Sequence, residues 1–376
     1  MGSVTPVMVR TSERTMFCKC RQAHWWSYIE QRQPIEGWSP ALVFGDMVHR
    51  CMAAYYIPET RKRRKRGPHP ASTFGKLYDK MNANGKAFRV RVDDEFWINA
   101  RELGVGMMEN YVDQWREEDK RYVILYPEMP FQIAIKDPLT GEILCIYVGT
   151  ADALILDTLT GRLGLFEHKT AAAISTEHLF LDEQASSYWC LIPRWLLENE
   201  IIKPEQNMDF MLYNFMRKAL KDDRPQNALG QYLNLPTVDQ LKAHLMNTGL
   251  TRDAITGLKK DQLEALVRKR KFDPAQLGEV SKVQPPALFH RELLYRGVHE
   301  QENTYRRIIE QVREMNLVRT GAMPHYKAPS KECRFCEWKD ICELHETGSD
   351  WKELKRITTK KWSPYEQHIW SIDLNE

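Results

Sequence analysis

Asp152, Glu167 and Lys169 are the residues of this chain whose types and spacing most directly predict chemistry. Asp152 opens one hydrophobic run and Glu167 closes the next, and the segment between these runs, DTLTG at 157–161, has the composition of a hairpin turn that ends in Gly. If this hairpin is centred between the third and fourth turn residues, Asp152 lies opposite Glu167, with Cβ atoms roughly 5 Å apart. Because side chains alternate along a strand, Lys169 shares the face of Glu167.

Two carboxylates this close repel each other, and one takes up a proton unless a cation lies between them. The flanking residues are apolar, so we expect a central pair of strands in which unpaired charge is costly. A divalent cation between Asp152 and Glu167 resolves the conflict, and carboxylate oxygens suit Mg²⁺ or Mn²⁺. A simpler interpretation stays open from these residues alone: Glu167 pairs with Lys169 on a solvated strand, and Asp152 caps a loop.

The composition is that of a globular protein without a membrane-spanning segment. Its 376 residues allow one large domain with insertions or two domains, and 43% hydrophobic residues can bury a sizeable core. The net charge is only +3, so overall charge does not by itself indicate nucleic-acid binding. No run approaches ~18 apolar residues. The start of the chain lacks the apolar core of a signal peptide, which predicts a reducing cytoplasm.

Hydrophobic periodicity predicts most of the secondary structure. Helices are expected over residues 12–30, 42–56, 177–199 and 291–316, over most of 74–118, and as two short helices around Gly249. Besides the central hairpin, strands are expected at 122–127, 131–136, 143–148 and 209–216. His49 lies beside the apolar stripe of the second helix, where a histidine of the core or its rim is commoner than a metal ligand.

Two basic stretches could contact nucleic acid. The first consists of Arg61, Lys62, Arg63, Arg64, Lys65 and Arg66. Six like charges cannot be buried together, so we expect an exposed loop, either a solvated linker or an arm that contacts DNA phosphates. The second ends a leucine-rich segment, 236–275, which resembles the helix-extension-helix of SAP-type DNA-binding modules; a plain helical insertion is the alternative.

Three of the eight cysteines lie close together near the end of the chain, Cys333, Cys336 and Cys342. In a reducing compartment we expect metal binding rather than disulfides, and thiolates suit either zinc or an iron–sulfur site. A fourth cysteine must come from elsewhere. Cys18 and Cys20, more than 300 residues upstream, are the candidates.

Taken in order, these motifs resemble one branch of the PD-(D/E)XK nuclease superfamily. It is the RecB/AddB-like exonucleases, including CRISPR-associated exonucleases and phage-encoded relatives, in which an N-terminal cysteine and a C-terminal triplet flank a D…E-x-K core. The resemblance covers about residues 12–217 and 281–346. It implies an α/β fold, with a restriction-endonuclease-like mixed β-sheet flanked by helices and an iron–sulfur-stapled N-/C-terminal helical region. The nuclease domain would comprise 1–235 and 281–376, with 236–275 inserted.

The resemblance also implies cofactors and site residues. Phe17-x-x-Cys20-x-x-x-x-Trp25 matches the opening helix of the family, which makes Cys20 the fourth ligand of a [4Fe–4S] cluster with Cys333, Cys336 and Cys342. The motifs Gly45-x-x-x-His49, Gly149-x-x-Asp152, Glu167-x-Lys169 and Gln184-x-x-x-Tyr188 match the nuclease site. They imply Mg²⁺ or Mn²⁺ held by His49, Asp152, Glu167 and the backbone carbonyl of His168, with Lys169 orienting the attacking water and Gln184 and Tyr188 contacting the phosphate.

The function implied is that of a metal-dependent DNA exonuclease acting in DNA processing or recombination of a phage or CRISPR-type system, in the cytoplasm of a bacterial or phage-infected cell. Single-stranded ends are favoured, and 11 Trp and 15 Tyr are available for stacking on bases. A non-catalytic iron–sulfur DNA-binding adaptor is the alternative, although such a protein would be expected to have lost a metal or lysine residue. Recombination or CRISPR-adaptation partners and self-association stay open.

Overall fold

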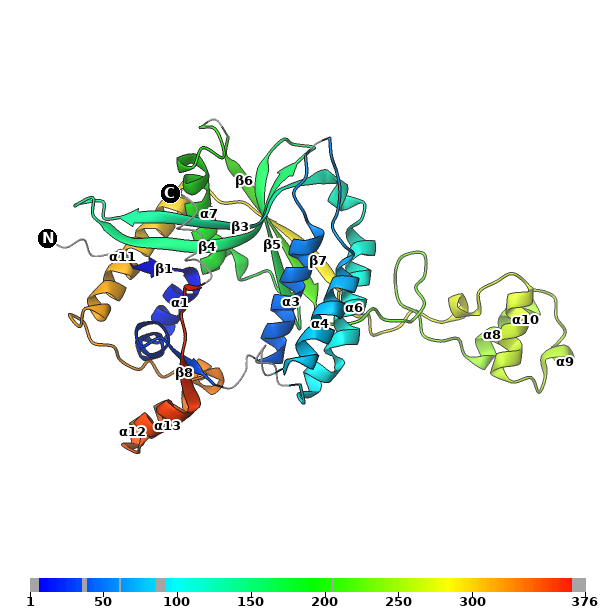
Figure 1. The fold of residues 1–376 in the computed structure, drawn as a ribbon. Coiled ribbons are helices and arrows are strands. Elements are labelled where there is room, and N and C mark those ends of the chain that lie inside the picture. Colours follow the sequence, from blue (N-terminus) through cyan, green and yellow to red (C-terminus); the bar gives the residue numbers. More distant parts are fainter. Residues whose placement is uncertain (1–6, 36–38, 61, 86–91, 205, 367–376) are drawn as a thin grey trace. The chain divides into compact units, whose positions relative to one another are not determined.

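The computed structural model describes residues 7–35, 39–60, 62–85, 92–204 and 206–366 (Figure 1). The chain forms two compact units. The larger comprises residues 1–219 and 289–376, and the smaller comprises 220–288. The predicted insertion, 236–275, lies within the smaller unit. None of the helices in the described part of the chain has the length and hydrophobicity needed to cross a lipid bilayer.

A mixed sheet forms the centre of the larger unit, as predicted. Its strands are β1 (Met8–Val9), β3 (Tyr122–Lys136), β4 (Ile143–Asp157), β5 (Leu163–Ala171), β6 (Met208–Arg217) and β7 (Phe289–Leu294). The order is β1-β4-β5-β6-β7, and β3 pairs with β4. β5 and β6 are parallel, whereas β4 is antiparallel to β3 and β5, and β7 is antiparallel to β6. β5 therefore has a partner along both edges.

Helices cover both faces of this sheet (Figure 1). One layer contains α1 (Thr11–Lys19), α7 (Glu183–Glu198) and α11 (Val298–Arg319), and the other contains α3 (Pro40–Tyr55), α4 (Pro70–Ala83) and α6 (Glu95–Trp115). Side chains alternate between two apolar cores: Leu165 belongs to the core under α7, and Phe166 belongs to the core under α3. Burial on both faces explains why the central strands read as nearly continuous apolar runs.

The two hairpins of the sheet are closed by the same turn chemistry, DPLTG at 137–141 and DTLTG at 157–161. In the second turn, the Asp157 carboxylate accepts hydrogen bonds from the backbone N–H of Leu159 (3.0 Å) and from the hydroxyl of Thr160 (2.7 Å). Gly161 has φ +72°, a conformation that favours Gly. Leu156 pairs with Leu163, so the hairpin is centred where the sequence predicted.

The beginning and the end of the chain lie together. Strand β2 (Arg32–Pro34) pairs with β8 (Thr359–Lys361), and α12 (Lys339–Thr347) packs against α13 (Trp351–Thr358). The predicted helix over 12–30 is interrupted at Cys20, whose backbone is extended; α2 (Arg21–His24) and a π-helical turn (Trp25–Ile29) follow. Trp26 and Trp338 are the largest side chains of the small apolar core that joins the two ends.

Two predictions of secondary structure are wrong. The predicted helix over 291–316 begins only at Val298, because Phe289–Leu294 forms strand β7 along the open edge of β6. The two strands predicted at 122–127 and 131–136 are one strand, β3, with a register shift between Ile124 and Tyr126. Among the described strands β3 pairs with β4 alone, so its prolines do not have to donate to a second neighbouring strand.

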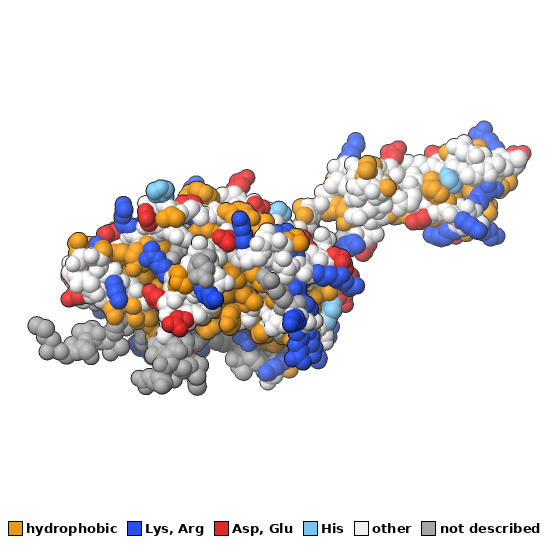
Figure 2. Space-filling view, turned by 90° about the horizontal axis from the view of Figure 1, so that it is seen from above, with side chains coloured by type: hydrophobic (Ala, Val, Ile, Leu, Met, Phe, Trp, Pro, Cys, Tyr) orange, Lys and Arg blue, Asp and Glu red, His pale blue; other side chains and the backbone are white. Residues whose placement is uncertain are grey.

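The smaller unit contains the short helices α8 (Val238–Asn247), α9 (Arg252–Ile255) and α10 (Lys260–Lys269). Their apolar side chains form a core of their own, with Leu241, Leu245 and Leu263 at its centre. The basic run 268–271 that closes α10 is exposed. Figure 2 shows Lys and Arg side chains gathered along one edge of this unit.

Candidate active site

The β4–β5 hairpin places Asp152 and Glu167 next to each other. Ala153 pairs with Phe166, so the next pair in this register is Asp152 with Glu167. The backbone N–H of His168 donates to Asp152 Oδ2 at 2.6 Å. The Glu167 side chain is 1% exposed, and its Oε1 has no hydrogen-bond partner among the described residues. The two carboxylates therefore lie in the middle of the sheet, and one oxygen is buried without a donor.

Lys169 and Gln184 lie beside Glu167. Lys169 Nζ lies 3.9 Å from Glu167 Oε2 and donates to Gln184 Oε1 at 2.7 Å. The amide of Gln184 approaches Glu167 Oε2 at 3.5 Å. Helix α7 delivers Gln184 in its first turn because the Asp182 side chain caps the helix by accepting from the backbone N–H of Ala185. The ammonium group is therefore fixed from two sides.

His49 reaches the site from the opposite layer. Helix α3 begins at Pro40, where the Ser39 side chain accepts from the backbone N–H of Leu42. His49 Nδ1 lies 3.1 Å from Asp152 Oδ1. A Cβ atom at Gly45 would lie 3.3 Å from Thr170 Oγ1, so Gly at this position lets α3 approach β5 closely. The Gly45-x-x-x-His49 spacing thus brings the imidazole to Asp152.

Tyr188 supports the strand that carries Asp152. Its hydroxyl donates to the carbonyl of Thr150 at 2.9 Å, and its ring meets Phe131 edge-on. A Cβ atom at Gly149 would lie 2.6 Å from the Phe131 ring and 3.3 Å from the Tyr188 ring, so Gly149 allows this packing. Burial raises the pKa of Tyr188, which keeps the phenol protonated. The side chain holds β4 in place from within the core.

The two carboxylates differ in protonation. Burial, followed by repulsion from Asp152, raises the pKa of Glu167 well above its usual range. Burial would also raise the pKa of Asp152, but its hydrogen bond to His49 and the charge of that imidazole outweigh burial and lower it. Without a cation, Asp152 therefore ionises more readily than an ordinary aspartate, and Glu167 keeps its proton to a higher pH than an ordinary glutamate.

The residues present fit a divalent cation. Within the described ranges, no three His, Cys, Asp or Glu side chains already lie together in a metal-ligating group, and His49 and Asp152 bind each other instead. The carboxylates of Asp152 and Glu167 are nevertheless opposed at one point of the sheet, and Glu167 Oε1 has no donor among the described residues. A cation between them would satisfy that oxygen and remove the repulsion that raises the pKa of Glu167.

A family model described as PD-(D/E)XK nuclease superfamily matches residues 11–343. The chain belongs to the PD-(D/E)XK nuclease superfamily. A search of curated proteins found no match. Proteins of this superfamily are generally nucleases and usually use Mg²⁺ or Mn²⁺, and the mixed sheet flanked by helices is consistent with the restriction-endonuclease-like fold. The RecB/AddB-like branch and the iron–sulfur cluster stay predictions.

Glu128 is a further carboxylate beside the candidate site, and sequence reasoning missed it. Pro127 pairs with Ala153 and Met129 pairs with Ala151, so Glu128 on β3 lies opposite Asp152 on β4. Its φ of 44° is unusual for a residue other than Gly. The residue is exposed, yet partial desolvation and then the charge of Asp152 raise its pKa to about 7. The available signal was the gap between the predicted strands 122–127 and 131–136, in which Glu128 lies.

The cysteines of the predicted cluster gather at the joined chain ends. Cys20, Cys336 and Cys342 pack around Trp26 and Trp338, and a groove of about 1150 Å³ beside them is also lined by Cys333. Burial raises the pKa of Cys336 and of Cys342. The charges of Cys20 and Cys333 raise both further, and the charge of Cys336 also raises the pKa of Cys342. A metal ion or cluster would hold these cysteines as thiolates, but within the described residues no three of them already lie close enough together to form a metal-ligating group.

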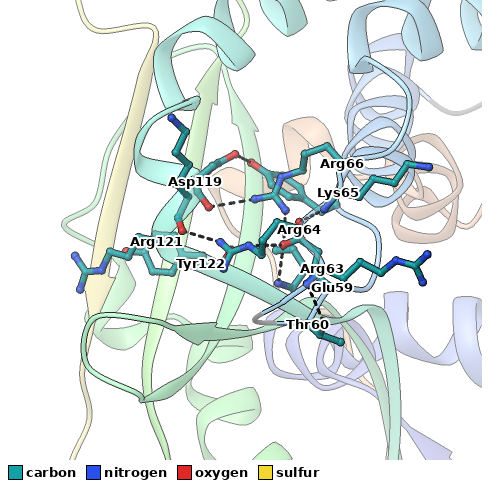
Figure 3. Close-up of polar contacts among 12 residues, drawn as sticks. Glu59, Thr60, Arg63, Arg64, Lys65, Arg66, Asp119, Arg121 and Tyr122 are labelled. Atoms are coloured by element: carbon teal, nitrogen blue, oxygen red, sulfur yellow. Dashed lines mark hydrogen bonds and ion pairs between the residues drawn. The ribbon is translucent and has the colours of Figure 1, made fainter.

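Some side chains of the basic loop point into the solvent, and others bind to the rest of the protein. Arg61 lies outside the described residues, and Lys62, Arg63, Arg64 and Lys65 are exposed. Arg66 is half-buried, with Nη1 at 2.6 Å from Glu59, and Arg64 Nη2 donates to the carbonyls of Lys120 (2.7 Å) and Tyr122 (2.9 Å). Figure 3 shows Arg63 and Lys65 pointing away from these contacts. The expectation of six solvated charges is therefore wrong for Arg66, because the buried Glu59 carboxylate requires a cation.

The raised pKa of Glu167 predicts how stability depends on pH. Above this pKa the folded protein must hold a charged, buried carboxylate, whereas below the ordinary carboxyl pKa the same group is neutral in both states. With metals removed by a chelator, Glu167→Gln is therefore expected to raise the melting temperature at pH 8 and to raise it less at pH 5. The exposed Glu177 provides the control, since Glu177→Gln should change neither value. A lower melting temperature of Glu167→Gln at pH 8 would contradict the assignment.

Proposed function

We propose that this protein is a Mg²⁺- or Mn²⁺-dependent deoxyribonuclease that degrades DNA from single-stranded ends. The observation that carries the proposal is the opposed pair Asp152 and Glu167 at the centre of the sheet, where Glu167 is buried and its carboxylate lies 3.9 Å from Lys169 Nζ. A carboxylate pair with a neighbouring ammonium group suits phosphodiester hydrolysis, because it can hold a cation and stabilise developing negative charge. Every position that such chemistry requires carries a competent residue.

Four groups of the chain would hold the cation: His49, Asp152, Glu167 and the backbone carbonyl of His168. The cation, when bound, supplies a Lewis acid for the scissile phosphate and lowers the pKa of a bound water. Lys169 Nζ, held by Gln184 Oε1 at 2.7 Å, orients the attacking water and stabilises charge on the phosphate oxygens. Gln184 contacts both Lys169 and Glu167, which positions it to bind the phosphate as well.

Tyr188 acts in this proposal as a positioning residue. Its hydroxyl already donates to the carbonyl of Thr150, two residues before Asp152. Its ring packs against Phe131, which lies on the neighbouring strand β3. It therefore contributes by holding the strand of Asp152 rather than by contacting phosphate. This differs from the role that the family resemblance implied.

A [4Fe–4S] cluster on Cys20, Cys333, Cys336 and Cys342 would tie the beginning of the chain to its end. The support is the common core of Cys20, Cys336 and Cys342 with Trp26 and Trp338, and the groove beside it that all four cysteines line. Cys18 is exposed and does not belong to this core. The cluster would be structural, because it joins segments more than 300 residues apart.

DNA contacts would come from the exposed residues of the basic loop, Lys62, Arg63 and Lys65, and from the exposed basic run 268–271 of the smaller unit. Both present cations that a phosphate backbone can bind. The setting in phage or CRISPR-type DNA processing, and protein partners there, belong to the same proposal and derive from the family branch.

The experiment compares three DNA substrates in the presence of Mn²⁺: a linear single strand blocked at its 5′ end, one blocked at its 3′ end, and a closed single-stranded circle. We expect shortening of only one linear substrate and an intact circle, while Asp152→Asn leaves all three intact. If the circle is cut as fast as the linear strands, the protein is an endonuclease and the proposed exonuclease activity is wrong. Three intact substrates with the wild-type protein would reject the proposed function.

A further inference from the structure

A buried chain of hydrogen bonds begins at His168, the residue between Glu167 and Lys169. His168 is 3% exposed, and its imidazole Nδ1 lies 2.9 Å from Asn214 Nδ2. Asn214 is its partner on the neighbouring strand β6 and also donates to the hydroxyl of Tyr111 at 3.0 Å. The imidazole is therefore fixed by a group that is itself fixed in the core.

The chain continues from α6 to the end of α3. The hydroxyls of Tyr111 and Tyr56 lie 2.7 Å apart, and the Tyr56 hydroxyl donates to Asp119 Oδ2 at 2.8 Å. Because a carboxylate only accepts, Tyr56 donates to Asp119, Tyr111 donates to Tyr56, and Asn214 supplies N–H groups to both Tyr111 and His168. His168 then carries its proton on Nε2. Each side chain of this chain is buried.

Asp119 is where this chain meets the basic loop. Its carboxylate binds Arg291 Nη2 at 2.6 Å, and its backbone carbonyl accepts from Arg66 Nη2 at 3.1 Å (Figure 3). Arg66 also pairs with Glu59 at 2.6 Å, and Arg64 donates to the carbonyl of Lys120, the next residue after Asp119. The inward-facing arginines of the loop thus bind the short 3₁₀ segment Glu118–Arg121 that carries Asp119.

This polar chain crosses an otherwise apolar core. Arg291 lies over the rings of Trp115 (4.2 Å) and Phe166 (5.1 Å), and Asn214 Oδ1 is buried with no partner among the described residues. A buried network that leaves an acceptor unsatisfied is less stabilising than apolar packing of the same volume. One end of the network is His168, between Glu167 and Lys169, and the other end is the basic loop. A role in joining the proposed cation site to the loop therefore explains these buried polar groups better than a contribution to folding stability does.

We infer that His168, Asn214, Tyr111, Tyr56 and Asp119 form a positioning network that holds the metal-binding segment of β5 and joins it to the basic loop. The network acts through the backbone of His168, whose N–H binds Asp152 and whose carbonyl is one of the proposed cation ligands. Arg64 and Arg66 anchor the loop, and Lys62, Arg63 and Lys65 remain to bind phosphates. The inference rests on the proposed function for the identity of the cation site.

The test uses Tyr111→Phe, which removes one hydroxyl from the middle of the network and keeps the ring. Tyr78→Phe is the matched control. Tyr78 is buried like Tyr111, but its hydroxyl donates to the carbonyl of Trp97, which lies outside the network. Mn²⁺ binding is measured by titration calorimetry without DNA, and kcat and KM are measured with DNA. We expect Tyr111→Phe to weaken Mn²⁺ binding about 10-fold and to lower kcat with KM unchanged. Tyr78→Phe should keep the wild-type Mn²⁺ affinity and kcat.

Tyr56→Phe interrupts the same network one bond further from His168 and provides a second variant if Tyr111→Phe does not fold. It should weaken Mn²⁺ binding in the same direction. Wild-type Mn²⁺ affinity in both tyrosine variants would overturn the inference.

The link to the loop is tested with Arg66→Gln against Arg63→Gln. Arg66→Gln should weaken Mn²⁺ binding, and its effect should be non-additive with that of Tyr111→Phe, since both interrupt one network. Arg63→Gln should leave Mn²⁺ binding unchanged, raise KM for DNA and reduce the slope of log KM against log salt by ~1. Equal behaviour of the two variants would overturn the division of the loop.

The outcomes separate this inference from the proposed function. A wild-type protein that binds Mn²⁺ but does not cleave DNA rejects the proposed function, while the Mn²⁺ titrations of the variants still decide on the network. A wild-type protein that cleaves DNA, with Tyr111→Phe equal to Tyr78→Phe in every measurement, rejects the network alone. A wild-type protein that binds no Mn²⁺ rejects both.

Discussion

Replacing Glu167 by Gln is expected to reduce the rate of DNA cleavage on the order of 1,000-fold in saturating Mn²⁺, with the fold retained. The buried Oε1 has no donor among the described residues, and the amide that replaces the carboxylate carries no charge to hold a cation. Asp152→Asn should have an effect of similar size for the same reason. Glu167→Gln should thus stabilise the metal-free protein at pH 8 and, in the presence of Mn²⁺, remove nearly all of its activity.

The control for this result is Glu177→Gln, which changes an exposed carboxylate beyond the end of β5. It should cleave DNA at the wild-type rate. Activity of Glu167→Gln within about threefold of the wild type would contradict the assigned site, because the loss of a required metal ligand costs far more than this.

Replacing Cys20 by Ser is expected to remove the bound iron and to lower the melting temperature more than any other single cysteine substitution. Cys20 shares an apolar core with Cys336 and Cys342, and it belongs to the beginning of the chain whereas they belong to the end. The wild-type protein, purified without oxygen, should be brown, with broad absorbance near ~400 nm that Cys20→Ser loses. Without the cluster, the two ends would still be joined by β2–β8 pairing, the tryptophan core and polar contacts such as the Lys355–Glu30 ion pair.

Cys18→Ser is the matched control, since Cys18 lies two residues away and is exposed. It should keep both the colour and the melting temperature of the wild type. Stoichiometric zinc without iron in the protein purified without oxygen would reject the cluster type. Equal effects of Cys18→Ser and Cys20→Ser would reject the ligand assignment.

The sequence predicted the hairpin because its determinants are local. The Asp157 carboxylate, the Thr160 hydroxyl and Gly161 are within five residues, and they set the register that opposes Asp152 and Glu167. The alternation of side chains then places Lys169 next to Glu167. The mixed sheet and the helix layers followed from the family resemblance and not from periodicity.

The features that the sequence did not reveal depend on distant residues. Glu128 faces Asp152 only because β3 continues through two prolines as an edge strand, and strand β7 forms only because β6 leaves an edge open. Arg66 turns inward because Glu59 is buried, and its neighbour Arg63, of the same type, does not. Composition within a loop does not distinguish such residues, because burial is decided by what packs against them.

The most direct test of the account is a crystal structure of the protein soaked with Mn²⁺, with the anomalous scattering of manganese used to locate the ion. We expect one ion between Asp152 and Glu167, with carboxylate oxygens at roughly 2.2 Å and the His49–Asp152 hydrogen bond replaced. A site that stays empty at saturating Mn²⁺, or an ion bound away from both carboxylates, would contradict it.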